Sequence, residues 1–157
     1  MGSSQQSGGS GVTQSNDPVS ERGFPRVRIA AAVMLDHAGR ILLVRKRHTL
    51  FFMQPGGKLE DGETTLDTLA RELNEELGCT LLQATPLGIF SAWAANEAGQ
   101  VVEAALFHVE SAGDIKQGAE IEEFVWVQPG DPGALRLAPL TRQHVLPLIL
   151  SRGLKAF

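Results

Sequence analysis

The sequence is poor in cysteine, in surplus positive charge and in long apolar runs. Its one cysteine, Cys79, cannot form an internal disulfide and offers no multi-cysteine zinc cluster, which favours a reducing, cytoplasmic compartment. The formal net charge of −4 disfavours general attraction to long nucleic acids. No apolar run approaches the roughly 20 residues of a membrane-spanning helix. These absences predict a globular protein without a membrane partner or a stable nucleic-acid partner.

The amino-terminal segment lacks the apolar side chains that a core requires. Residues 1–23 are mainly Ser, Gly and Gln, with Met1, Val12 and Val19 as the larger apolar residues. Such a segment cannot bury enough surface to offset the entropy lost on ordering. We therefore predict a disordered leader, whose first four residues also match an appended expression tag, followed by a single domain over residues 24–157.

Apolar runs separated by turn-forming residues predict the strands. The runs at 27–35 and 41–47 flank a short polar segment and predict a β-hairpin. Further strands are expected at 80–95, with a break at Pro86, at 101–110 and at 124–127. A final amphipathic helix is expected at 140–150, bent or delayed by Pro147. Strands on both sides of an early helix predict an α/β fold with helices flanking a mixed sheet.

The early helix is strongly acidic on one face. Thr64 or Thr65 is a suitable N-cap and Gly78 a suitable stop. An apolar stripe is expected to pack on the sheet, and it contains Leu66, Leu69, Ala70, Leu73 and Leu77. The adjoining face carries Glu72, Glu75 and Glu76, although like charges three or four residues apart destabilise a helix by roughly 0.2–0.5 kcal/mol per pair. The cluster therefore indicates a bound cation.

Magnesium is the cation that best fits this pattern. Mg²⁺ prefers oxygen ligands and is commonly held by a few carboxylates while substrate phosphates complete its shell. It also allows a negatively charged protein to hold a phosphate. Such a site neutralises phosphoryl oxygens and activates a water for in-line attack, with a carboxylate accepting the proton. Arg71 is better suited to positioning, held in bidentate fashion by Glu63.

The segment from Gly57 to Cys79 resembles the Nudix box, G-x5-E-x7-R-E-U-x-E-E-x-G-U, where U is a bulky aliphatic residue. Every invariant position is filled, by Gly57, Glu63, Arg71, Glu72, Glu75, Glu76 and Gly78, and only Cys79 departs mildly at the last U. The segments "LLVRKR" and "QPGGK" extend the resemblance over most of residues 27–127. The resemblance implies the Nudix fold, an α/β/α sandwich with a mixed β-sheet, and hydrolysis of a nucleoside diphosphate linked to a group X.

The same resemblance implies roles for individual residues. The Gly56 carbonyl, Glu72, Glu75 and Glu76 would hold Mg²⁺, or Mn²⁺ in its place. Glu72 is also the candidate base, and Glu63 would orient Arg71. Family members often add an acid from a later loop, for which Glu120 is the first candidate and Glu122 and Glu123 are alternatives.

Contacts to the rest of the substrate are less specified by the sequence. Arg45, Lys46 and Arg47 are candidates for phosphate contacts, although charges on an edge strand are equally often solvated. Phe52 and Trp93 are the preferred base-stacking candidates, against the ordinary alternative that an aromatic side chain belongs to the core. The four histidines show no metal-ligand spacing, and Cys79 is expected to be structural.

Several functions remain open within the family. The short segment before the box is similar to MutT-type members, which makes an oxidised nucleoside triphosphate such as 8-oxo-dGTP the first expected substrate. ADP-ribose is disfavoured because Ala94 stands where ADP-ribose hydrolases carry a proline. The alternatives are RNA-end hydrolysis, allylic diphosphate isomerisation, and a catalytically silent nucleotide-binding module. The family also includes many homodimers, so a homodimer remains open.

Overall fold

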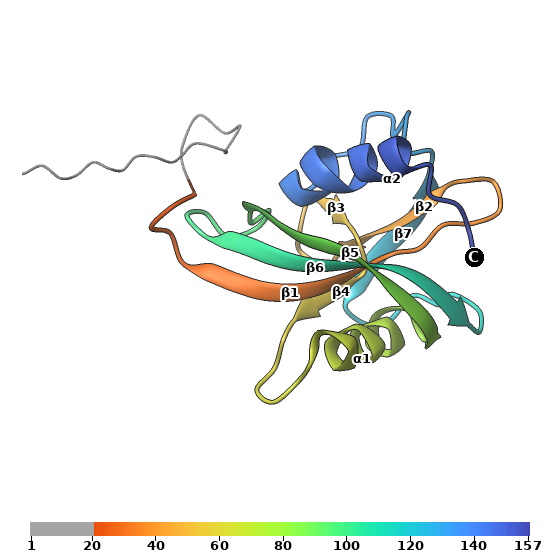
Figure 1. Cartoon of the computed structure of the whole chain (residues 1–157), viewed down its shortest axis with the longest axis horizontal. Coiled ribbons are helices and arrows are strands. Elements are labelled where there is room, and N and C mark those ends of the chain that lie inside the picture. Colours follow the sequence, from red (N-terminus) through yellow and green to blue (C-terminus); the bar gives the residue numbers. More distant parts are fainter. Residues whose placement is uncertain (1–20) are drawn as a thin grey trace, which may run out of the picture.

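The structure, a computed structural model, describes residues 21–157. Most of the predicted leader, residues 1–20, lies outside the described residues, so that prediction is untested. Two sheets form the centre of the molecule (Figure 1). The first has the order β4-β1-β6-β5 and the second the order β3-β2-β7. The strands are β1 (Arg26–Val33), β2 (Ile41–Lys46), β3 (Phe52–Met53), β4 (Gly56–Lys58), β5 (Thr80–Trp93), β6 (Val101–Ala112) and β7 (Ile121–Val127).

Two helical segments cover the sheets from opposite sides. Helix α1 (Thr65–Leu77) lies on one side, and the carboxy-terminal helix α2 (Leu146–Arg152) lies on the other (Figure 1). Strands β1 and β6 run parallel, whereas the other paired strands are antiparallel. The predicted α/β/α arrangement with a mixed sheet is therefore confirmed. No helix within residues 21–157 has the length and apolar character needed to span a bilayer.

The predicted hairpin at 27–35 and 41–47 is wrong in its pairing. Both strands exist, as β1 and β2, but they belong to different sheets. They are linked only where they leave the turn, by an isolated bridge between Leu35 and Ile41. Alternating side chains of β1 and β2 are buried on the two faces of the sheets, against α2 on one side and α1 on the other. Strand β1 pairs with β4 and β6, and β2 pairs with β3 and β7. Hydrophobicity alone does not specify these partners.

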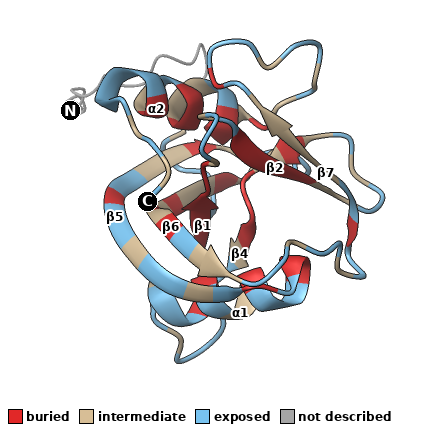
Figure 2. Ribbon diagram, turned by 90° about the vertical axis from the view of Figure 1, so that its right-hand side faces the viewer, coloured by how far each residue is buried: buried red, intermediate tan, exposed pale blue. Residues whose placement is uncertain are grey.

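Two apolar clusters fill the spaces between the layers. One joins the sheets to α2 and includes Leu146 and Ile149. The other joins them to α1 through Leu69, Leu73 and Leu77, which are fully buried. The inward sides of both helices are accordingly buried, whereas the outer strand β5 is largely exposed or half-buried (Figure 2).

The packed stripe of α1 differs from the predicted one at its edges. Leu66 and Ala70 are exposed, and Thr68 and Glu76 are buried instead. The two polar side chains can be buried because each has hydrogen-bond partners beside the helix: Thr68 donates to Glu63, and Glu76 accepts from a backbone N–H. Side chains of α1 are therefore buried both by apolar packing and by hydrogen bonding within a polar site.

Both ends of α1 are closed as the sequence indicates. Thr64 is the N-cap, and its hydroxyl accepts from the Asp67 N–H while Asp67 accepts from the Thr64 N–H. Gly78 ends the helix in the left-handed conformation, with φ of 65°. The backbone N–H groups of Lys116 and Gly118 then donate to the last carbonyls of α1, which fastens the β6–β7 loop to this end.

The predicted carboxy-terminal helix is present in two parts. Residues Thr141–Val145 form a π-helical turn, and the α-helix proper follows from Leu146 with Pro147 in its first turn. Proline has no N–H to donate and its ring crowds the preceding turn, so a wider turn before Pro147 avoids the clash. The proline therefore delays the regular helix, as predicted.

Candidate active site

Two glycines bring strand β4 close to its neighbours. Gly56 has φ of 149°, and a Cβ there would lie 2.7 Å from the Ala31 Cα and overlap the Ala30 carbonyl oxygen. A Cβ on Gly57 would overlap the Glu72 carboxylate. The first glycine therefore permits the approach of β4 to β1, and the second leaves room for a side chain of α1.

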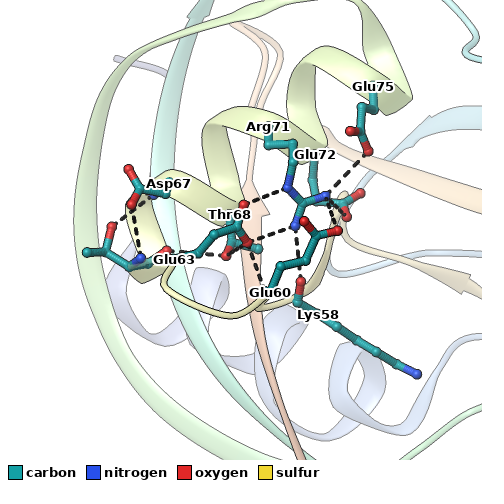
Figure 3. A network of polar contacts seen from close by, with 9 residues as sticks. Lys58, Glu60, Glu63, Asp67, Thr68, Arg71, Glu72 and Glu75 are labelled. Carbon is teal, nitrogen blue, oxygen red and sulfur yellow. Dashed lines mark hydrogen bonds and ion pairs between the residues drawn. The ribbon is translucent and has the colours of Figure 1, made fainter.

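Arg71 is the centre of a dense, partly buried polar network between α1 and the segment that precedes it (Figure 3). Its Nε and one terminal nitrogen donate to the two carboxylate oxygens of Glu63, at 2.7 and 2.9 Å. The other terminal nitrogen donates to Glu72 at 2.9 Å and to Glu75 at 3.4 Å. A further bond reaches the Lys58 carbonyl in β4 at 3.2 Å. With the Glu60 carboxylate 3.7 Å away, one guanidinium thus connects four acids and the Lys58 carbonyl.

Glu63 is held in its ionised form by this network. Hydrogen bonds from Arg71, then from the Glu60 N–H and the Thr68 hydroxyl, lower the pKa of Glu63 to about 2. The same bond to Glu63 raises the pKa of Arg71 further above its usual range. Glu63 and Arg71 therefore both remain charged at neutral pH, and their hydrogen bonds keep the guanidinium in a fixed position. The predicted orientation of Arg71 by Glu63 has a direct geometric basis.

Glu76 occupies a different environment from the other acids. Its side chain is only 4% exposed, and it accepts a hydrogen bond from the Gly56 N–H at 3.1 Å. The Lys46 ammonium lies 3.4 Å from its second oxygen. Burial raises the pKa of Glu76 to about 7, opposed by the nearby charge of Lys46. A buried carboxylate of this kind favours a neighbouring cation.

Two of the predicted ligands, Glu72 and Glu76, lie where α1 faces the Gly56–Gly57 turn. Glu72 lies against Gly57 and Glu76 binds the Gly56 N–H, whereas Glu75 is more exposed and turns to Arg71. Within residues 21–157 no three acidic, histidine or cysteine side chains converge on one point. The donor set is nevertheless all oxygen and mostly carboxylate, which fits a hard cation such as Mg²⁺. In this arrangement Glu72 accepts a hydrogen bond from Arg71, and Glu76 is paired with Lys46.

The three consecutive basic residues have separate partners. Arg45 binds Glu123 at 2.9 Å, and Arg47 binds Glu122 at 2.9 Å, so both face acids of β7. Lys46, the middle residue, is instead paired with Glu76 of α1. The antiparallel register of β2 and β7 decides this division, because it places Arg45 opposite Glu123. Charge pattern alone does not reveal which basic side chains are already paired.

The two preferred aromatic candidates lie in different surroundings. Phe52 is 6% exposed and belongs to the core beneath α2. Trp93 is half-buried at the end of β5, where its ring makes an edge contact with Phe24 at 4.9 Å between centroids. The loop after β5 carries Glu97, whose carboxylate lies 3.7 Å from the Lys58 ammonium. Trp93 therefore lies nearer the protein surface than Phe52 does.

The candidate late-loop acid, Glu120, is the last residue of the β6–β7 loop, which is fastened to α1. Glu120 is exposed, and its backbone carbonyl accepts from the Arg47 N–H at 2.9 Å. A Cβ on Gly118 would overlap the Glu75 carbonyl oxygen, so the loop approaches α1 as closely as backbone allows. The alternatives Glu123 and Glu122 are already paired with Arg45 of β2 and with Arg47, which directly follows β2.

Three features of this site were not predicted from the sequence. They are the Thr68 hydroxyl that supports Glu63, the Lys46–Glu76 ion pair, and the close packing of Gly118 on α1. A threonine within the packed stripe of a helix was the available signal for Thr68. The other two arise from contacts between segments far apart in the chain.

Comparison with known proteins identifies the fold family. The model of the NUDIX domain matches residues 25–149, which is most of the chain. This chain belongs to the Nudix family. Among solved structures, the MutT Nudix hydrolase from Burkholderia pseudomallei is 25% identical, with a TM-score of 0.66 over 79% of this chain and 98% of its own. The MutT protein from Methanosarcina mazei is 22% identical with a TM-score of 0.69, over 85% of this chain and 99% of its own, which supports the Nudix fold alone.

Curated relatives share shorter stretches with this Nudix chain. The 8-oxo-dGTP diphosphatase of Proteus vulgaris is 41% identical over 66 residues, which are 40% of this chain and 59% of that protein. The ADP-ribose pyrophosphatase of Methanocaldococcus jannaschii is 28% identical over 98 residues, 60% of this chain and 58% of that protein. The chain therefore spans less than two thirds of either relative.

Proposed function

We propose that this protein is a Mg²⁺-dependent hydrolase that cleaves the diphosphate linkage of a nucleoside diphosphate-X compound by attack of water on phosphorus. The observation that carries the proposal is the complete Nudix box folded around one guanidinium, with Glu72 and Glu76 placed against the Gly56–Gly57 turn. The named activities of the two curated relatives, a diphosphatase and a pyrophosphatase, support the same reaction class.

The chain's own residues have distinct tasks in this reaction. The Gly56 carbonyl, Glu72, Glu75 and Glu76 would hold the cation, which supplies positive charge at the phosphoryl oxygens. Glu72 accepts the proton of the attacking water. Arg71, fixed by Glu63 at 2.7 Å, holds Glu72 in place through a 2.9 Å bond. The acids therefore start from a defined geometry, which lowers the cost of reaching the reactive arrangement.

The first proposed substrate is a nucleoside triphosphate with an oxidised base, such as 8-oxo-dGTP. The 41% identity with a protein of that named activity favours it over ADP-ribose, whose named relative is 28% identical. The isomerase alternative is less suitable because Cys79 is fully buried and burial raises its thiol pKa. Intact acids at all box positions favour turnover over a silent binding module.

A substrate panel tests this proposal. The panel contains ordinary and oxidised nucleoside triphosphates, ADP-ribose and a 5′-triphosphorylated RNA, each with Mg²⁺ or Mn²⁺, and scores kcat/KM and product identity. Hydrolysis in water enriched in ¹⁸O identifies the phosphorus that is attacked. We expect Glu76→Gln to abolish turnover, whereas Glu110→Gln on the exposed side of β6 leaves it unchanged. Nucleotide binding without turnover by the wild-type protein would instead support the silent module.

A further inference from the structure

Lys46, the last residue of β2, is paired with Glu76 of α1. Its ammonium lies 3.4 Å from the Glu76 carboxylate, which is 4% exposed and takes its other hydrogen bond from the Gly56 N–H. The flanking arginines are bound to Glu122 and Glu123. Among the described residues Lys46 is therefore the side-chain cation paired with this buried acid.

The local shape of β2 directs the Lys46 side chain towards Glu76. The pairing of β2 with β7 shifts between Arg45 and Lys46, so that Arg45 lies opposite Glu123 but Lys46 lies opposite Ile121. Such a bulge re-aims a side chain relative to a regular ladder. The next residue, Arg47, is fixed by its N–H bond to the Glu120 carbonyl and by its side-chain bond to the Ala119 carbonyl. The surrounding backbone thus holds Lys46 at the acidic site.

We propose that Lys46 is an internal counter-ion that holds Glu76 before a divalent cation binds, and that its ammonium then moves to the phosphates of the substrate. This inference rests on the proposed function. A lysine suits the exchange because its ammonium makes single, non-forked contacts on a flexible stem. With the side chain 35% exposed, the ammonium is free to turn outward without opening the core.

The Lys46 ammonium and a divalent cation repel each other, so they compete for the position beside Glu76. A buried carboxylate without a counter-ion is strongly unfavourable, which explains why Lys46 is useful before the metal arrives. Once a divalent cation shares Glu76, an ammonium at the present distance would be repelled, and the incoming phosphates would attract it. Lys46 would thus lower metal affinity in the free protein and raise phosphate affinity in the metal-loaded protein.

Direct metal binding tests this inference without relying on turnover. Free Mn²⁺ is measured by electron paramagnetic resonance at pH 8.5 for the wild type, Lys46→Gln and Lys46→Arg. We expect Lys46→Gln to bind Mn²⁺ on the order of tenfold more tightly, because no ammonium has to be displaced. Lys46→Arg should bind it more weakly than wild type, because a guanidinium can grip the carboxylate with two bonds. In the presence of Mn²⁺, inorganic pyrophosphate should bind Lys46→Gln more weakly than wild type.

Thermal unfolding supplies a second readout and a control. Metal-free Lys46→Gln should melt below the wild type, and Mn²⁺ should raise its melting temperature by more than it raises that of the wild type. Arg40→Gln removes an exposed cation paired with Asp36 and should change neither metal affinity nor the Mn²⁺-induced shift. If Lys46→Gln does not fold, the weaker binding expected of Lys46→Arg still tests the inference.

The outcomes separate this inference from the proposed function. Unchanged or weaker Mn²⁺ binding by Lys46→Gln, or unchanged binding by Lys46→Arg, would overturn the counter-ion role while leaving hydrolysis by the wild type intact. A wild-type protein that neither binds Mn²⁺ nor hydrolyses any panel substrate would overturn the proposed function, and the counter-ion role with it.

Discussion

Replacement of Gly57 by alanine should separate activity from stability. The added Cβ would lie 2.6 Å from the Glu72 Cδ, whereas carbon atoms in ordinary contact are about 3.5–4.0 Å apart. The carboxylate must therefore retreat by about 1 Å. It is the far end of a flexible side chain, so the backbone can remain in place.

The retreat should be costly for catalysis and mild for folding. A displacement of about 1 Å at a reacting group typically lowers the rate on the order of 100-fold. The Arg71–Glu72 bond would weaken, but these side chains are 22% and 15% exposed, so we expect a loss of only about 1 kcal/mol. For a protein of this size that corresponds to a melting temperature lower by about 3 °C.

The assay compares kcat/KM on the best substrate, Mn²⁺ affinity and melting temperature in Gly57→Ala and in a matched variant. Gly130→Ala is the match, because its Cβ would meet only the Leu150 Cδ2 at 3.8 Å, an ordinary contact. It should behave as the wild type in all three measurements. Wild-type activity in Gly57→Ala, or a collapse of stability that accounts for the lost activity, would refute the assignment of Gly57 as the space in which Glu72 works.

Two further variants probe the support around the site, and a third probes a partly buried histidine that packs against Phe157. Gly118→Ala should lower the free energy of unfolding by about 2 kcal/mol in chemical denaturation, because its Cβ would lie 2.8 Å from the rigid Glu76 carbonyl oxygen; wild-type stability would contradict the close packing. Glu63→Gln should be less stable than the wild type above pH 4.5, and this difference should vanish as the pH falls towards 2. The reason is that the folded-state pKa of Glu63 is lowered from 4.5 to about 2. A difference in stability that does not depend on pH would refute this. Burial lowers the pKa of His108 from 6.5, and its Nε2 has no hydrogen-bond partner among residues 21–157. The wild type should therefore lose stability as the pH falls through 6.5, and His108→Gln should lose less, which denaturation at pH 7.5 and 5.5 measures.

The sequence by itself determined the local structure and the family. The sequence predicted an N-cap at Thr64 or Thr65, a stop at Gly78 and an acidic face on α1. These are local features, set by backbone geometry and by residue spacing along one helix. The Glu63–Arg71 pair also joins two residues only eight positions apart. Patterns of this range can be read directly from a sequence, because the contacts are made within one continuous segment.

Only the tertiary structure decided how distant segments meet. The apolar runs of β1 and β2 predicted two strands, but their assignment to different sheets depends on competition among all strands and both helices. Likewise, the sequence does not distinguish among the three adjacent basic residues. The register of β2 on β7 pairs Arg45 and Arg47 with acids, whereas Lys46 pairs with Glu76. Such pairings depend on position in space, which composition and periodicity do not encode.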